Sequence, residues 1–179
     1  MIKHRNLHMI SPVKYFFSIS IIIFLSYYGF SQDQKFLEKT RVQHKINEAR
    51  HNYLDGNIKS SLINFKEANA LDPGNTKAQY GMAKCYYKLH NYNKSKEFGE
   101  KVFQKDPNVD PDINYLLGET YFRLNDLEKA KEKLLAFKSS TKSKAKLKDY
   151  SVSLKIKQVE YAQEALIKAN PKISIKNMG

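Results

Sequence analysis

Residues 76–107 have the sequence TKAQYGMAKCYYKLHNYNKSKEFGEKVFQKDP, and this stretch decides the fold. Its first half places Tyr80, Ala83 and Tyr87 at the three- and four-residue spacing of one helix face. Its second half repeats that spacing after a short polar turn. The dipeptide Asp106-Pro107 then ends the pattern, because proline lacks a backbone donor and disfavours helical geometry in the residue before it. We therefore predict two amphipathic helices joined by a turn.

The same pattern occurs on both sides of this stretch. Upstream, Tyr53 falls on Tyr87 at an offset of 34 residues (87 − 53), and downstream Phe122 does so at an offset of 35 (122 − 87). Two helices approach to about 8 Å only where the side chains between them are small. The small residues that the three copies supply for these crossings are Ala49 with Ser61, Ala83 with Ser95, and Gly118 with Ala130.

This arrangement over residues 42–138 resembles the tetratricopeptide repeat, in which helix pairs recur every 34 residues. The chain departs from that pattern, since no repeat has the family's early tryptophan, Gly99 replaces a large residue and Phe137 replaces a small one. A plain helical bundle with accidental periodicity is the alternative. The resemblance implies an all-α, right-handed solenoid of about three helix hairpins, at about 42–75, 76–110 and 111–141, with a long C-terminal capping helix at about 143–169.

Residues 1–31 differ in composition from the rest of the chain. Their only formal charges are Lys3, Arg5 and Lys14, which precede an apolar run of about sixteen residues. This order is typical of a secretory signal peptide, with cleavage expected near Gln32. An uncleaved membrane anchor is the alternative. A bilayer-spanning helix needs about twenty apolar residues, and the run of about sixteen is somewhat shorter than that. The helical domain is expected at 32–169 and a short tail at 170–179.

The sequence does not favour an enzyme. It has seven glycines in 179 residues and no glycine-rich phosphate-binding motif. The histidines are not joined by carboxylates or cysteines at a recognised metal-ligand spacing, so we expect no metal, no cofactor and no catalytic residue. The single cysteine, Cys85, cannot form an internal disulfide and is expected to be a small core residue.

A binding surface is the better hypothesis, because stacked helix pairs curve and the first helix of each pair lines the concave face. Aromatic rings flanked by cations suit an extended peptide or an acidic segment of a protein partner. For the most repetitive of these positions, Tyr53, Tyr87 and Phe122, packing between repeats is the alternative. The residues that the resemblance places in the groove are Arg50, Tyr53, Tyr80, Lys84, Tyr87, Lys88, Tyr115, Glu119, Phe122 and Arg123.

The formal charge of +13 raises nucleic acid as a possible partner, but an export signal argues against it. We instead predict an exported protein-interaction scaffold of a bacterial cell envelope, in the periplasm or associated with the outer membrane. The leader and the tail are also similar to the N-terminal repeat module of OmpA-like and type IX secretion-associated envelope proteins. The alternatives are a membrane-anchored assembly factor, or a basic module that contacts anionic envelope polymers through Lys142, Lys144, Lys146 and Lys148.

Overall fold

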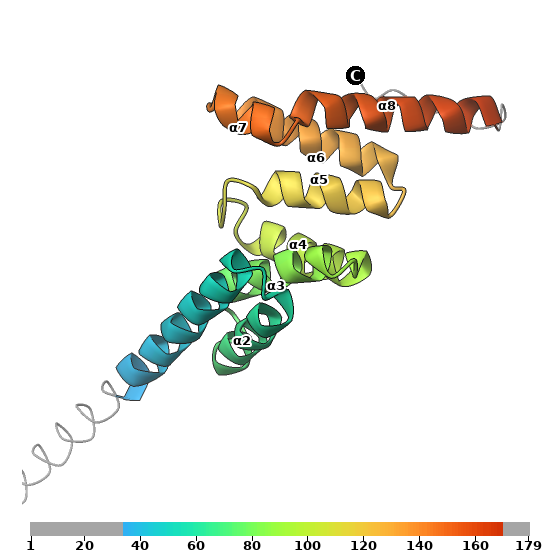
Figure 1. The fold of residues 1–179 in the computed structure, drawn as a ribbon. Helices are drawn as coiled ribbons and strands as arrows, with labels where there is room; N and C mark the ends of the chain where they lie inside the picture. Colours follow the sequence, from blue (N-terminus) through green and yellow to red (C-terminus); the bar gives the residue numbers. More distant parts are fainter. Residues whose placement is uncertain (1–33, 170–179) are drawn as a thin grey trace, which may run out of the picture. The chain divides into compact units, whose positions relative to one another are not determined.

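The structure is a computed structural model, which describes residues 34–169. All secondary structure in this range is α-helical (Figure 1), as predicted. Among the described residues, 34–41 and 42–169 belong to separate compact units, and the second contains the helix pairs. Residues 34–54 are helical, and they are followed by α2 (Ile58–Leu71), α3 (Thr76–Lys88), α4 (Tyr92–Lys105), α5 (Ile113–Arg123), α6 (Leu127–Ser140), α7 (Lys144–Asp149) and α8 (Val152–Ala169).

From α2 to α6, each helix packs against the next one along the chain, and α8 packs against α6 and α7. The predicted signal peptide and the tail lie outside the described residues. Within residues 34–169, no helix combines the length and the apolar character needed to cross a membrane.

The turns inside the helix pairs recur with the repeat. Gly56, His90 and Asn125 occupy equivalent places, and each has a positive φ, at 81°, 58° and 60°. A residue in this left-handed region commonly ends a helix. The next helix then begins with a side-chain cap in two of the three pairs, where Asn91 accepts from the Lys94 backbone N–H and Asp126 from that of Lys129. His90 therefore has a structural place in a turn.

The small residues predicted for the helix crossings are all buried. Ala49, Ser61, Ala83, Ser95 and Ala130 have no exposed surface, and Gly118 is buried as well. At the first crossing, the Ser61 hydroxyl donates to the Ala49 carbonyl at 2.8 Å, which satisfies the buried hydroxyl. The predicted crossing positions are confirmed.

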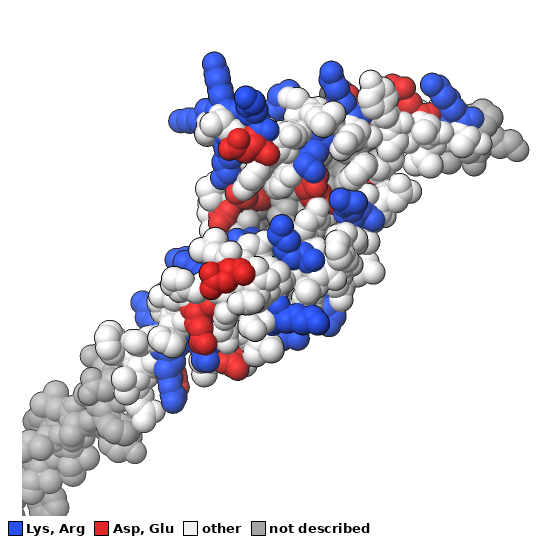
Figure 2. Space-filling model, in the orientation of Figure 1, with Lys and Arg blue, Asp and Glu red and all other residues white. Residues whose placement is uncertain are grey.

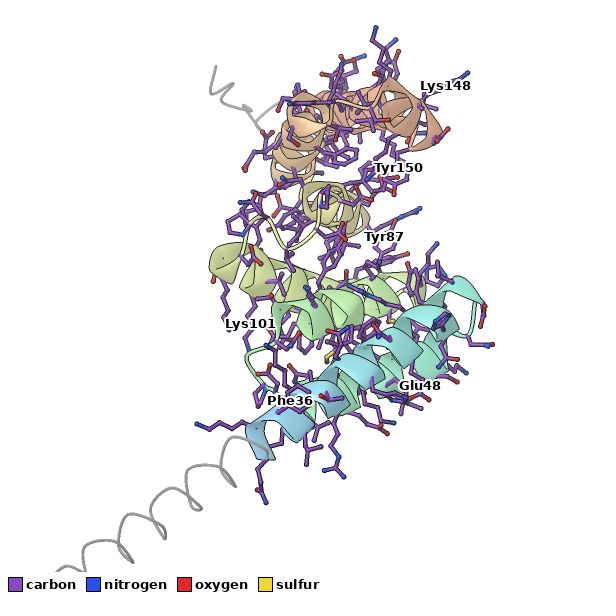
Figure 3. The ribbon with its side chains drawn as sticks, turned by 90° about the vertical axis from the view of Figure 1, so that its left-hand side faces the viewer. Phe36, Glu48, Tyr87, Lys101, Lys148 and Tyr150 are labelled. Atoms are coloured by element: carbon purple, nitrogen blue, oxygen red, sulfur yellow. The ribbon has the colours of Figure 1, made fainter. Side chains whose placement is uncertain are left out.

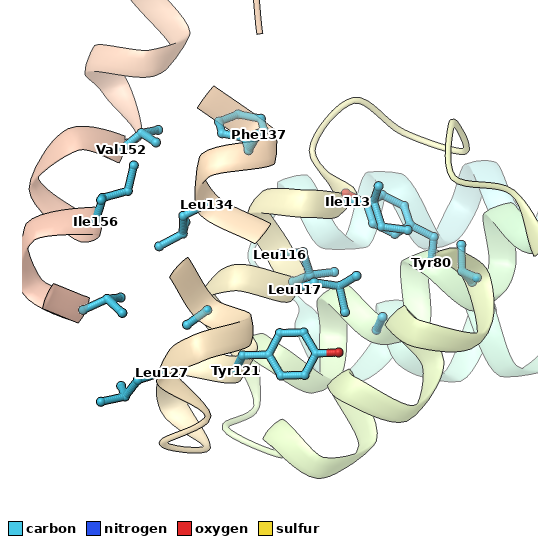
Figure 4. Packing of buried hydrophobic residues seen from close by; sticks show 14 residues of the cluster. Tyr80, Ile113, Leu116, Leu117, Tyr121, Leu127, Leu134, Phe137, Val152 and Ile156 are labelled. Carbon is cyan, nitrogen blue, oxygen red and sulfur yellow. The ribbon is translucent and has the colours of Figure 1, made fainter. Parts of the chain in front are cut away.

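The residues that depart from the family pattern fit their neighbours. A Cβ at Gly99 would lie 2.8 Å from a methyl of Leu117, so Leu117 fills the space that a large residue would occupy. Phe137 is fully buried and stacks on Tyr150, with ring centroids 5.8 Å apart. Figure 4 shows Leu117 and Phe137 within the larger of two hydrophobic clusters, which extends from α3 to α8.

The prediction of one continuous helix over 143–169 is wrong in one respect. The helix breaks between α7 and α8 at Tyr150 and Ser151, and Ser151 has a φ of +49°. The break turns Tyr150 onto Phe137 and Tyr115, while Val152, Ile156 and Val159 bury a separate face of α8. Burial of the aromatic ring and of the apolar face together outweighs the strain of one left-handed residue, which costs about 1–2 kcal/mol.

Candidate functional site

A groove with a volume of about 640 Å³ opens on the face that carries the predicted binding residues. Five tyrosines line it, three of them on α3 or α5, and Figure 3 shows Tyr87 and Tyr150 projecting from the same side of the helices. The lining residues are Tyr53, Tyr80, Lys84, Tyr87, Lys88, Asp110, Asp112, Tyr115, Leu116, Glu119, Asp149, Tyr150, Ser151, Leu154, Lys155 and Gln158.

The structure brings seven of the ten predicted residues together in this groove, namely Tyr53, Tyr80, Lys84, Tyr87, Lys88, Tyr115 and Glu119. Arg50 lines a smaller adjoining pocket of about 270 Å³, which shares Tyr53, Tyr80 and Lys84 with the groove. Phe122 and Arg123 line neither of these two pockets. A role in binding stays a prediction for all ten residues.

Tyr80 belongs as much to the core as to the groove. It is only 5% exposed, and its hydroxyl donates to the Asp110 carboxylate at 3.2 Å. Burial, followed by the charge of Asp110, raises the pKa of the Tyr80 hydroxyl above its ordinary value. Packing between repeats, which was the alternative for Tyr53 and Tyr87, applies to Tyr80 as well, because Tyr80 packs into the large hydrophobic cluster.

Glu119 is the centre of a buried polar contact between three helices. Its side chain is 7% exposed, and one carboxylate oxygen accepts from the Tyr87 hydroxyl of α3 at 3.1 Å and from the Lys155 ammonium of α8 at 2.7 Å. Burial, followed by the charge of Glu119, raises the pKa of Tyr87 to about 12. The carboxylate therefore ties α8 to the repeats.

Lys84 and Lys88 stand one helical turn apart on α3. The Lys84 ammonium lies 4.8 Å from the centroid of the Tyr53 ring and 5.4 Å from that of Tyr80, within the range of cation–π attraction. Lys88 is exposed. Within residues 34–169 neither lysine forms an ion pair, so both keep their charge available to a ligand.

Several groove residues escaped the sequence analysis, and they come from the loop before α5 and from the C-terminal helices. Asp112 accepts from the Tyr150 hydroxyl at 2.7 Å and pairs with the Lys146 ammonium. The sequence predicted a helix covering the last repeat, but nothing in its spacing indicated the break that turns Tyr150 into the groove.

The charge of the groove differs from the expectation of a cationic surface. Its lining contains the cations Lys84, Lys88 and Lys155 and the anions Asp110, Asp112, Glu119 and Asp149. Three positive and four negative groups nearly balance. The net positive charge of the chain is therefore carried outside the groove.

Part of that charge surrounds α7, where Figure 2 shows blue side chains gathering. Lys142, Lys144 and Lys148 are exposed. Lys146, which was expected to belong to the same basic surface, is half-buried and paired with Asp112. No group of histidine, cysteine and acidic residues within 34–169 could hold a metal ion.

Comparison with known proteins gives similarity mainly at the level of the fold. No family model matches the chain. The transcription factor tau 131 kDa subunit of Saccharomyces cerevisiae is 41% identical over 54 residues, which are 30% of this chain and 5% of that protein. The chain thus spans a small part of the curated relative that it matches.

Solved structures match over a larger share. The Yersinia enterocolitica type III secretion chaperone SycD, in complex with a peptide of the translocator YopD, is 16% identical with a TM-score of 0.58, over 68% of this chain and 93% of that one. The second tetratricopeptide domain of human RPAP3, in complex with an HSP70 peptide, is 12% identical with a TM-score of 0.58, over 69% of this chain and 98% of that one. The chain therefore has a tetratricopeptide-like, all-α repeat fold, as predicted.

Proposed function

We propose that this protein is an interaction scaffold that binds a peptide or a protein segment in the tyrosine-lined groove. The observation that carries the proposal is the convergence of Tyr53, Tyr80, Tyr87, Tyr115 and Tyr150 on one groove of about 640 Å³. Tyrosine side chains offer a large contact area at a small cost in conformational entropy, which suits the recognition of an extended chain.

The two solved structures that share the fold support this proposal, since each holds a peptide. The groove chemistry narrows the class of peptide. Asp110, Asp112 and Glu119 already bond to tyrosines or lysines of the chain itself, whereas Lys84 and Lys88 remain available. We expect a ligand with apolar or aromatic side chains for the rings and one acidic side chain near Lys84 and Lys88.

A clamp for the terminal carboxylate of a peptide is not part of the proposal. The family builds such a clamp from lysines and asparagines, but this chain has Ile46, Arg50, Gly81, Asp112 and Leu116 at corresponding positions. Of these, Ile46, Gly81 and Leu116 are buried. The ligand is therefore expected to be an internal segment of its protein as readily as a C-terminal one.

A displayed library of random peptides tests the proposal. Peptides selected on the full chain would be synthesised, and their affinity measured by fluorescence anisotropy. We expect Tyr53→Ala combined with Lys88→Ala to weaken binding about tenfold or more, since it removes an aromatic contact and an available cation. The matched control is Leu135→Ala with Lys101→Ala, two exposed residues that do not line the groove.

Circular dichroism must show that both double variants keep the helical content of the parent chain. Failure to select any peptide, or equal binding by both double variants, would contradict a role of the groove. Tyr80→Ala is unsuitable for this purpose, because Tyr80 is part of the core.

Export to the cell envelope is the second part of the proposal, and the leader-like composition of residues 1–31 supports it. Cell fractionation followed by N-terminal sequencing of the natural protein tests this part. An N-terminus near Gln32 in a periplasmic or outer-membrane fraction is the expected result. Membrane-bound protein that keeps Met1 would instead favour the anchored assembly factor, and full-length soluble cytosolic protein would contradict export.

Contact with anionic envelope polymers is a second candidate function, favoured by the exposed Lys142, Lys144 and Lys148. Surface charges are screened at moderate salt, so such contact should weaken steeply as salt is added. Sedimentation of the full chain with vesicles of anionic lipid, over a series of salt concentrations, tests it. Binding that does not change with salt would contradict this candidate.

A further inference from the structure

The last described helix carries apolar side chains on the face opposite to its buried one. Val152, Ile156 and Val159 are buried. By contrast, Leu154 is 57% exposed and Tyr161 is 67% exposed. At 100° per residue, these two side chains lie on the side of α8 away from that buried face. α8 packs against α6 and α7 (Figure 1), and the exposure of Leu154 and Tyr161 leaves this face largely uncovered by residues 34–169.

The exposed face has the spacing of a coiled-coil seam. Leu154, Gln158, Tyr161, Ala165 and Lys168 follow one another at intervals of four, three, four and three residues. This alternation is the a/d pattern of the heptad repeat, in which residues on one seam face a partner helix. All five are exposed.

The seam is complementary to itself in one antiparallel register. When Leu154 of one copy lies opposite Ala165 of the other, Tyr161 lies opposite Gln158 and both layers repeat across a two-fold axis. A large side chain then meets a small one, and a tyrosine hydroxyl meets an amide. A two-fold interface uses the same patch on both copies, so each favourable contact occurs twice.

The charges beside the seam favour the same register. Lys157 and Glu164 occupy equivalent flanking positions one heptad apart, and both are exposed. In the antiparallel register, Lys157 of one copy lies beside Glu164 of the other, and the reverse pair completes the symmetry. Within residues 34–169 neither residue forms an ion pair, so both charges are available for this contact.

We propose that this face of α8 is a homodimer interface, in which two copies pair antiparallel through Leu154, Tyr161 and Ala165 and are oriented by two Lys157–Glu164 ion pairs. Since Leu154 and Gln158 also line the groove, the second copy would contribute to its edge. The seam covers only a few turns, so we expect a weak dimer with a dissociation constant on the order of 10–100 μM. The inference does not depend on what the groove binds.

A charge-exchange experiment tests the interface and its register. Light scattering coupled to size-exclusion chromatography of the full chain should show dimer at high concentration and monomer at low concentration. Lys157→Glu alone and Glu164→Lys alone should each raise the dissociation constant about tenfold, because two attractive pairs become repulsive. A mixture of the two variants should restore the dimer, since each copy then supplies charges of one sign only.

Tyr161→Glu provides a second route, because it places a charge in the centre of the seam and should abolish the dimer. The exposed Leu135→Glu on α6 is its control and should leave the dimer intact. Monomer at all concentrations, single variants that dimerise as well as the parent chain, or a mixture that fails to dimerise would each overturn the proposal. Groove binding by the Tyr161→Glu variant is measured separately, so the two proposals can fail independently.

Discussion

The two junctions between consecutive repeats place large and small residues in opposite order. At the first junction, Phe65 of α2 lies against Gly81 of α3, where a Cβ atom would overlap its ring. At the second, Gly99 of α4 leaves the space and Leu117 of α5 fills it. Gly99 is the counterpart of Phe65, 34 residues further along the chain. The repeat therefore conserves the filled volume of a junction, and either repeat can supply it.

The polar contacts at the two junctions also use different residue types at equivalent positions. Ser61 lies 3.3 Å from the Cys85 sulfur at the first junction, and Ser95 lies 3.1 Å from the Thr120 hydroxyl at the second. These pairs are repeat counterparts, at offsets of 34 and 35 residues. Cys85 is fully buried and stands where the next repeat has a threonine. This agrees with the prediction that Cys85 is a small core residue.

The two junctions differ more clearly in the residues that face the groove. Tyr53 faces the ammonium of Lys84 across the first junction, and its counterpart Tyr87 donates to the Glu119 carboxylate across the second. Glu119 stands at the repeat position of Lys84. The carboxylate also accepts from Lys155. Among the residues that the structure describes, only the second junction is thus linked through charge to the C-terminal helices.

Removal of the large side chain should have the largest effect on stability. We expect Phe65→Ala to lower the free energy of unfolding by about 3–5 kcal/mol, because it leaves a cavity beside Gly81. Leu117→Ala should cost about 2–5 kcal/mol at the second junction. Urea unfolding followed by circular dichroism measures both. A cost below about 1 kcal/mol for either variant would mean that its junction does not depend on the filled volume.

Adding a methyl group should distinguish the junctions by the size of its cost. Gly81→Ala is expected to cost about 1–3 kcal/mol, since the Phe65 ring must move. Gly99→Ala should cost less than about 1 kcal/mol, because only the end of a flexible leucine is in the way. In the Phe65→Ala background, Gly81→Ala should instead stabilise by about 0.5–1 kcal/mol through helix propensity. The same unfolding assay applies, and the absence of this reversal would contradict the proposed overlap.

The hydroxyl at the second junction is expected to matter by a smaller amount. Thr120 has no exposed surface, and its hydroxyl donates to the Leu116 carbonyl at 2.7 Å besides contacting Ser95. Thr120→Val should lower the free energy of unfolding by about 1–2 kcal/mol, because Ser95 loses its buried partner. The exposed Ser60→Ala serves as the control and should change it by less than about 0.5 kcal/mol. Equal effects would show that the buried pair contributes nothing.

The smallest effect concerns the tyrosines at the groove. The pKa values of Tyr53 and Tyr87 are raised from 10.0 to about 12, for Tyr53 mainly by burial and for Tyr87 by burial and then by Glu119. A raised tyrosine pKa means that the neutral form stabilises the fold below pH 10, and that this contribution is lost as the pH rises towards 12.

Glu119→Gln should therefore lower the pKa of Tyr87 and leave that of Tyr53 unchanged. Nuclear magnetic resonance of the chain with isotope-labelled tyrosine rings, titrated with base, follows both groups. Assignment uses Tyr53→Phe and Tyr87→Phe. Equal changes in the pKa values of Tyr53 and Tyr87 would show that the two junctions are electrostatically alike. That result would contradict the difference expected from Lys84 at the first junction and Glu119 at the second.

Much of the fold could be predicted from the sequence because the repeat fixes it. Tyr53 and Tyr87 gave the register, and the small residues at the crossings followed from that register. These features are local or periodic, so a single sequence contains the information needed to place them.

The rest depends on contacts between residues that are far apart in the sequence, and the repeat pattern does not predict such contacts. The space at Gly99 is filled by Leu117 eighteen positions later (117 − 99), so the sequence alone showed only a missing side chain. The break at Ser151 follows from the fit of Tyr150 on Phe137, which competes with helix continuity. Lys146 likewise does not belong to the expected basic surface, because it pairs with Asp112, which lies beside it in space.

The reversed order at the two junctions also bears on how such a chain can evolve. If the second repeat were duplicated in tandem, Gly99 of one copy would meet Met82 at the place where Leu117 now lies, and Gly81 would lose the ring of Phe65. Met82 nearly matches the volume of Leu117, but the space at Gly81 that the Phe65 ring fills would be left empty. Insertion of a repeat would thus require compensating substitutions on its neighbours, and the number and order of repeats in this protein are fixed by the shapes of individual side chains.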